Sequence, residues 1–220
     1  MISWLSQMWV QRLGWTLVHF LWQGTAIALL YTILSRLAMR GRSAKLRYVL
    51  ACTALCAMTA APPLTLAVLA DENGMQPHAA WWTLSAATSA RLLPAMVMVW
   101  FAGVLFFSTR LFVGLRLTKR LRTTAHPAPE EWREVLTRLC EPGRAVALLV
   151  SSLVDVPAVV GWLKPVILVP VEFLAGLPAG YITALLAHEL AHVRRRDYLV
   201  NVLQSVAEAV LFYHPAVWWI

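Results

Sequence analysis

Long apolar runs dominate the pattern of hydrophobic and polar positions along the chain. Three of them contain no Asp, Glu, Lys or Arg, namely Leu13–Ser35, Tyr48–Ala70 and Leu92–Thr109. A fourth run, Tyr198–Ile220, carries a single charged residue, Glu208. Because a helix needs about 20 mostly apolar residues to cross the hydrocarbon core of a bilayer, this pattern predicts four transmembrane helices.

The composition agrees with insertion into a membrane. Of the 220 residues, 60% are hydrophobic and only 14% are charged, whereas a soluble domain carries about 25% charged residues. These values exclude a soluble globule and a disordered chain. The net charge is +8, but the basic residues flank the apolar runs. We therefore interpret the charge as a signal of membrane topology and expect a lipid bilayer, with no direct nucleic-acid partner.

The distribution of basic residues predicts the orientation of the chain. One basic group separates the first two runs and a second group follows the third run, whereas the segment 71–91 has a single basic residue. The two groups are Arg36, Arg40, Arg42, Lys45 and Arg47, and Arg110, Arg116, Lys119, Arg120 and Arg122. Since positively charged loops stay in the cytoplasm, the N-terminus is expected outside and residues 117–197 inside.

The segment 117–197 has the pattern of a small α+β domain. A helix is predicted over Glu130–Cys140 by its apolar positions. Three β-branched runs, Val146–Val150, Val156–Val160 and Val166–Val169, predict a small antiparallel sheet with an exposed edge. The chain then divides into a membrane region (1–116) with three spans, a cytoplasmic segment (117–197) and a fourth span (198–220).

One motif in the cytoplasmic segment carries specific chemistry. His188-Glu189-Leu190-Ala191-His192 is an HExxH sequence inside a helical pattern. Residues i and i+4 share one helix face, so the two imidazoles can bind one metal ion, for which Zn²⁺ is the expected species. Glu189 lies beside the metal and is the predicted general base of peptide hydrolysis. We therefore predict His188 and His192 as metal ligands and Glu189 as the catalytic residue.

The third zinc ligand is ambiguous. Glu208 is the only acidic residue after Asp197, yet an unbroken helix would place it about 24 Å from His192. We favour a pairing of Glu208 with a polar group of another span, and His214 meets the same difficulty of distance. The candidate partners for Glu208 are His19, Gln23 and Asn201.

Charged residues follow the motif directly. Arg194–Arg196 are interpreted as the cytoplasmic anchor of the fourth span, in reach of anionic headgroups. Two interpretations of Asp197 stand. It pairs with Arg194, which we favour, or it orients a ligand histidine.

Three segments together resemble the M56 (BlaR1/MecR1-like) family of membrane metallopeptidases. They are the active-site stretch Ala187–Asn201, the preceding Lys164–Pro170 and the following Phe212–Trp218. The resemblance implies an α-helical multi-pass protein of the bacterial inner (cytoplasmic) membrane with a gluzincin-like zinc-peptidase segment. It also implies a third ligand, a Glu, just after the fourth span. Because the apolar run stops at Ile220 without a polar flank, we expect that ligand beyond Ile220, and weak or no zinc binding by the chain alone.

The same resemblance implies the substrate. It is a protein or peptide, cytosolic or close to the membrane, and in some relatives a transcriptional repressor or the enzyme itself, cleaved during signalling. In gluzincins an edge strand before the active-site helix binds substrate as an added strand, and Val166–Val169 is the candidate. Two alternatives remain. One is a non-catalytic signal transducer with a vestigial or structural metal motif, and the other is a transporter that uses Glu208 and His19.

Overall fold

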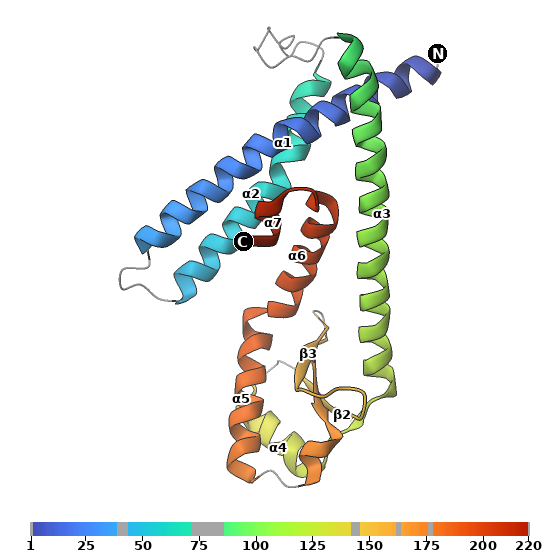
Figure 1. The fold of residues 1–220 in the computed structure, drawn as a ribbon. Helices are drawn as coiled ribbons and strands as arrows, with labels where there is room; N and C mark the ends of the chain where they lie inside the picture. Colours follow the sequence, from blue (N-terminus) through green and yellow to red (C-terminus); the bar gives the residue numbers. More distant parts are fainter. Residues whose placement is uncertain are drawn as a thin grey trace. The chain divides into compact units, whose positions relative to one another are not determined.

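The computed structural model describes residues 2–38, 44–71, 86–141, 146–161, 164–175 and 178–219. The chain forms two compact units (Figure 1). The helical unit contains Met1–Thr109 together with Val206–Ile220, and the mixed unit contains Arg110–Ser205. The predicted basic residues Arg40 and Arg42 lie outside the described residues, as do most of the residues of the predicted outer loop 71–91.

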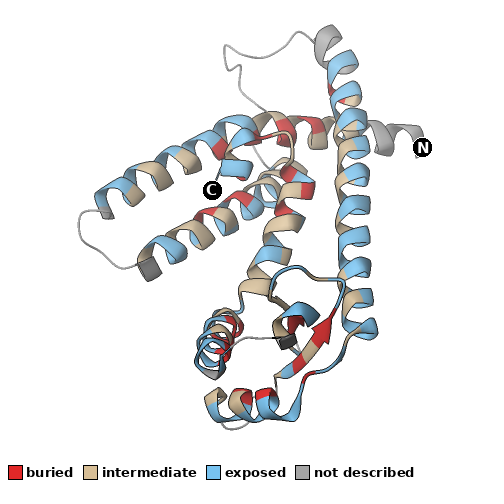
Figure 2. Cartoon of the chain, turned by 60° about the horizontal axis from the view of Figure 1, so that its bottom comes forward, coloured by how far each residue is buried: buried red, intermediate tan, exposed pale blue. Residues whose placement is uncertain are grey.

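The helical unit is built from long apolar helices. They are α1 (Ile2–Ala38), α2 (Ala44–Ala70) and the first part of α3 (Ala86–Thr124). In the described chain three segments are long and apolar enough to cross a membrane, Met8–Leu37, Leu46–Ala70 and Arg91–Thr124. Figure 2 shows exposed residues along most of the α3 surface, as expected for side chains that face lipid. The first three predicted membrane-length helices are therefore confirmed.

The predicted fourth span differs from the structure. Its sequence forms α6 (Asp197–Leu211), a turn over residues 212–214 and the short helix α7 (Pro215–Trp219). At 15 residues, α6 is about 22 Å long, which is shorter than the 30 Å hydrocarbon core. The break has a local cause, because Pro215 has no N–H to donate and disfavours helical geometry at His214. The prediction of one continuous helix over Tyr198–Ile220 is wrong.

The mixed unit contains a four-stranded sheet in the order β1-β2-β4-β3. The strands are β1 (His126–Pro127), β2 (Ala147–Ser151), β3 (Ala158–Val160) and β4 (Val166–Pro170). Strands β1 and β2 are antiparallel, as are β3 and β4, but β2 and β4 pair in parallel, with Leu149 opposite Leu168. The prediction of an antiparallel sheet is therefore wrong for its central pair.

Strand β4 is the centre of the sheet and not its edge. All five of its residues are buried, because both faces of the strand are covered. Ile167 and Val169 pack with residues of α4 (Glu130–Leu139) and α5 (Ala179–Arg195), and Val166 and Leu168 pack with Leu121 and Tyr198. The expectation that Val166–Val169 forms an exposed edge is wrong. A continuous apolar run is typical of a strand covered on both faces, and β3 lies at the edge instead.

The helix α5 carries the HExxH motif and ends at an unusual residue. Arg196 adopts the left-handed conformation (φ 58°, ψ 35°), and its N–H donates to the carbonyls of His192 and Val193. The next residue, Asp197, starts α6. In the described chain Arg196 is the one residue other than glycine with a positive φ. The chain thus changes direction between α5 and α6 at a single position.

This conformation predicts an unequal effect of two substitutions at position 196. Arg196→Val should destabilise the protein by about 1–2 kcal/mol, because β-branched residues tolerate the left-handed region poorly. Arg196→Gly should leave the stability unchanged or raise it slightly, since the Arg196 side chain is exposed. Thermal unfolding in detergent measures both. Arg120→Val, on the exposed helical surface of α3, is the control, and an equal loss for Arg196→Gly and Arg196→Val contradicts the prediction.

Candidate metal centre

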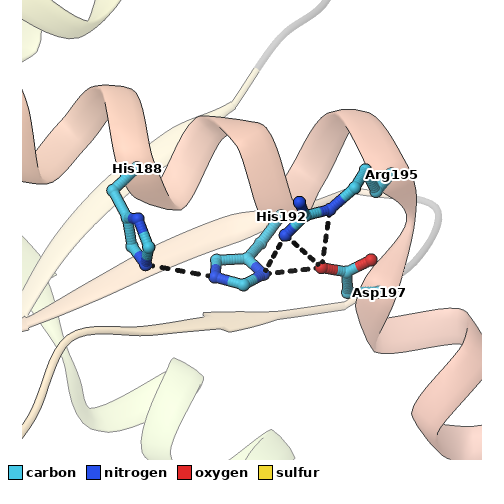
Figure 3. A network of polar contacts seen from close by, with 4 residues as sticks. All are labelled: His188, His192, Arg195 and Asp197. Carbon is cyan, nitrogen blue, oxygen red and sulfur yellow. Dashed lines mark hydrogen bonds and ion pairs between the residues drawn. The ribbon is translucent and has the colours of Figure 1, made fainter. Parts of the chain in front are cut away.

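Helix α5 presents the two motif histidines on one face. His188 and His192 are one turn apart, and their Nε2 atoms are separated by 3.3 Å (Figure 3). The rings meet edge to face, with centroids 4.9 Å apart. The opposite side of α5 packs into the core through Ile182 and Leu186. The apolar positions of the helix therefore fix which face carries the imidazoles.

The separation of the two nitrogens fits a shared zinc ion. Zinc binds imidazole nitrogen at 2.0–2.1 Å, and tetrahedral coordination then places two such ligands about 3.3–3.4 Å apart. The Nε2 atoms of His188 and His192 lie at this spacing. The spacing of these two residues is therefore compatible with two ligands of one tetrahedral zinc ion.

Asp197 fixes the orientation of the second imidazole. Its Oδ2 atom lies 2.6 Å from Nδ1 of His192, and the Asp197 side chain is 20% exposed. A carboxylate can only accept here, so Nδ1–H donates to Oδ2 and the lone pair of Nε2 is left available for a metal. This is the interpretation of Asp197 that the sequence favoured less, and the preferred pair with Arg194 is not formed.

Arg195 holds the Asp197 carboxylate in turn. Its Nε and Nη2 atoms donate to the same oxygen, Oδ2, at 3.2 and 3.0 Å. Nη2 also lies 3.1 Å from Nδ1 of His192. When Nδ1 carries its proton, both atoms are donors, so this contact is not a hydrogen bond. The other oxygen, Oδ1, is buried and has no hydrogen-bond partner within the described residues. His192, Asp197 and Arg195 therefore form one short chain of contacts.

The neighbouring arginine ties α5 to α4. Nη2 of Arg194 donates to the carbonyl of Leu139 at 3.2 Å, and its Nε lies 3.4 Å from Glu141 Oε1. Because Leu139 is the last residue of α4, this contact joins the C-terminal ends of the two helices. All three arginines are exposed, but Arg194 and Arg195 contact other residues of the protein.

Glu189, the predicted base, is 8% exposed. It follows His188 directly on α5, so it lies about 100° around the helix from that ligand. Its neighbour Leu190 is 2% exposed and belongs to the core side of the helix. Glu189 is therefore a buried residue next to a predicted ligand in the sequence, and its role as general base stays a prediction.

Within the described ranges, no third ligand joins the two histidines. Among the described residues no group of three His, Cys, Asp or Glu side chains could hold a metal ion. Glu208 belongs to the helical unit. Of the partners expected for it, Gln23 bonds to Thr65 at 2.9 Å and His19 accepts from Trp22 at 3.2 Å.

Comparison with known proteins places these observations in a family. The model of the BlaR1 peptidase M56 family matches residues 51–220. The chain is also similar to the protein named Regulatory protein BlaR1 from Bacillus licheniformis, with 25% identity over 150 residues. That alignment covers 63% of this chain and 24% of the relative, so the chain spans about a quarter of the relative's length. On the match over 51–220, which includes α5 and its HExxH sequence, the chain belongs to the M56 peptidase family.

Proposed function

We propose that the protein is a membrane-embedded zinc metalloendopeptidase that cleaves a cytosolic or membrane-proximal protein during signal transduction. The observation that carries this proposal is the 3.3 Å separation of the His188 and His192 Nε2 atoms. The contact of the Asp197 carboxylate with Nδ1 of His192 supports it. Membership of a peptidase family supports the reaction class. The proposed location is the cytoplasmic membrane of a bacterium, with the HExxH helix on the cytoplasmic side.

Each residue of the centre has a separate task in this proposal. His188 and His192 hold zinc through Nε2, and Asp197 keeps the His192 ring oriented and its Nδ1 protonated. Zinc, when bound, supplies a water of lowered pKa and polarises the scissile carbonyl. Glu189 accepts the proton of the attacking water and delivers it to the leaving amine. A third protein ligand beyond Ile220 stays a prediction.

The strand that receives substrate in this proposal is β3. It replaces Val166–Val169, because β4 is enclosed between β2 and β3. Ala158–Val160 forms an edge of the sheet and contacts α5. An extended peptide can pair with such an edge through its backbone. The substrate class is therefore an extended protein segment, such as a loop of a repressor or of the protein itself.

A second candidate function is a non-catalytic signal transducer with a structural or vestigial metal motif. The observation that favours it is that only two ligands meet in the described part of the chain. The two candidates differ in what they require of Glu189. A transducer needs the histidines and their helix but no general base, whereas a peptidase fails without it.

Replacement of the base should separate metal binding from hydrolysis. Glu189→Gln should lower peptide cleavage about 10²- to 10⁴-fold, because a positioned base contributes that factor, and it should leave the zinc content unchanged. His188→Ala should abolish both. Mass spectrometry of a peptide library and metal analysis of detergent-purified protein measure the two quantities. Glu172→Gln, at an exposed position, is the control, and full cleavage by Glu189→Gln would refute the peptidase proposal.

Loss of the carboxylate that orients His192 should weaken metal binding. Asp197→Ala should lower zinc affinity about 10- to 100-fold, the usual effect of removing such a partner of a ligand histidine. Competition with a chromogenic chelator measures the affinity, and circular dichroism checks the helix content. The matched control is Asp155→Ala, since Asp155 is exposed and distant in sequence from the motif. Equal affinities for the two variants would show that Asp197 has no role in the metal centre.

A further inference from the structure

The chain bends sharply between α6 and α7, within the helical unit (Figure 1). We call residues 212–219 the hook. Polar groups of the break are bonded within this unit. Trp100 Nε1 donates to the Val210 carbonyl at 2.8 Å, and Trp218 Nε1 donates to the Phe212 carbonyl at 2.9 Å. Because a bilayer core offers no water, non-helical backbone is stable there only when its polar groups are satisfied in this way.

His214 fastens the hook to α1. The side chain is 4% exposed. Its Nε2 donates to the Leu21 carbonyl at 3.0 Å, and its Nδ1 accepts the N–H of Ala216 at 3.2 Å. The close approach requires glycine at position 24, where a Cβ atom would lie 2.8 Å from Nε2 of His214. A buried imidazole with both nitrogens bonded is thus fitted against the backbone of a membrane-length helix.

The hook lies level with the middle of the apolar helices. Leu211 and Val217 pack with Phe20 of α1 and Met58 of α2. Phe20 is near the midpoint of Met8–Leu37, and Met58 is at the midpoint of Leu46–Ala70. On α3, the Phe212 ring lies over Gly103, where a Cβ atom would be 2.0 Å from Cζ, and stacks on Phe107 at 5.2 Å. Both belong to the charge-free run of that helix.

The direction of α7 follows from the contacts at its end. The turn meets α1 near Leu21 through His214, whereas the Trp219 ring meets Tyr31 with centroids 6.1 Å apart. Ten residues separate Leu21 from Tyr31, which corresponds to about 15 Å along the helix. The chain after the turn therefore runs back toward the Leu37 end of α1. That end precedes a basic group, which marks the cytoplasmic side.

We propose that α6 and the hook form a re-entrant hairpin in the bilayer. The chain enters from the cytoplasmic side, turns near the centre at residues 212–214 and returns to the same side. The length of α6 agrees, since 15 residues span about 22 Å and half of a hydrocarbon core is about 15 Å. The hairpin therefore enters the bilayer without crossing it. This topology does not depend on catalysis by the HExxH site.

Cysteine cross-linking in native membranes tests the hairpin. In a full chain with Cys52, Cys56 and Cys140 changed to Ser, the pair Tyr31→Cys and Trp219→Cys should form a disulfide on oxidation. The pair Leu13→Cys and Trp219→Cys should not. If residues 212–219 instead continued α6 as one helix, Trp219 would lie about 12 Å past Leu211, toward the end of α1 that contains Leu13. The pair with Leu13→Cys would then cross-link, and the pair with Tyr31→Cys would not. The reversed result, or no cross-link from either pair, overturns the proposal.

A second variant tests whether the contact with α3 holds the hook. Gly103→Leu should abolish most of the cross-link between positions 31 and 219, because its side chain would occupy the place of the Phe212 ring. Gly114→Leu is the matched control, since nothing lies within 4 Å of a Cβ atom at that position. Undiminished cross-linking by Gly103→Leu contradicts the packing described here. This result is separable from failure of the peptidase proposal, because it requires neither zinc nor substrate.

Discussion

The left-handed conformation of Arg196 is the constraint on which the candidate centre depends. Asp197 follows His192 by five positions, and on a continuous helix these residues would point about 140° apart. The bend at Arg196 ends α5 and starts α6, and it brings Oδ2 of Asp197 to 2.6 Å from Nδ1 of His192. A straight helix would keep the two histidines together but would leave the second ring without its carboxylate.

The parts of the fold that follow from local sequence could be predicted. The HExxH spacing alone places His188 and His192 on one face, because the helical period is independent of the rest of the protein. The first three membrane-length helices follow from apolar runs longer than a bilayer requires. In the fourth run Pro215 already indicates a break. The apolar length of Tyr198–Ile220 nevertheless favours the prediction of one continuous span. A hydropathy pattern shows which residues avoid water and does not show whether the chain turns among them.

Features that depend on distant pairing or on one unusual dihedral angle could not be predicted. The parallel pairing of β2 with β4 joins strands from different parts of the segment, and β-branched runs do not specify their partners. The same limit explains the wrong edge strand, since Val166–Val169 is covered on its second face by Leu121 and Tyr198, which lie far apart in the sequence. The sequence favours a pair of Asp197 with Arg194 over its role beside a ligand histidine, because arginine gives no signal for a left-handed residue.

The two units satisfy their polar groups in different ways, and α6 has to meet both requirements. In the first turn of α6, the Asp197 carboxylate accepts hydrogen bonds from the His192 ring and from the Arg195 guanidinium. At its last turn, the Val210 carbonyl accepts a hydrogen bond from the Trp100 indole. A helix with these two ends suits a boundary between water and lipid.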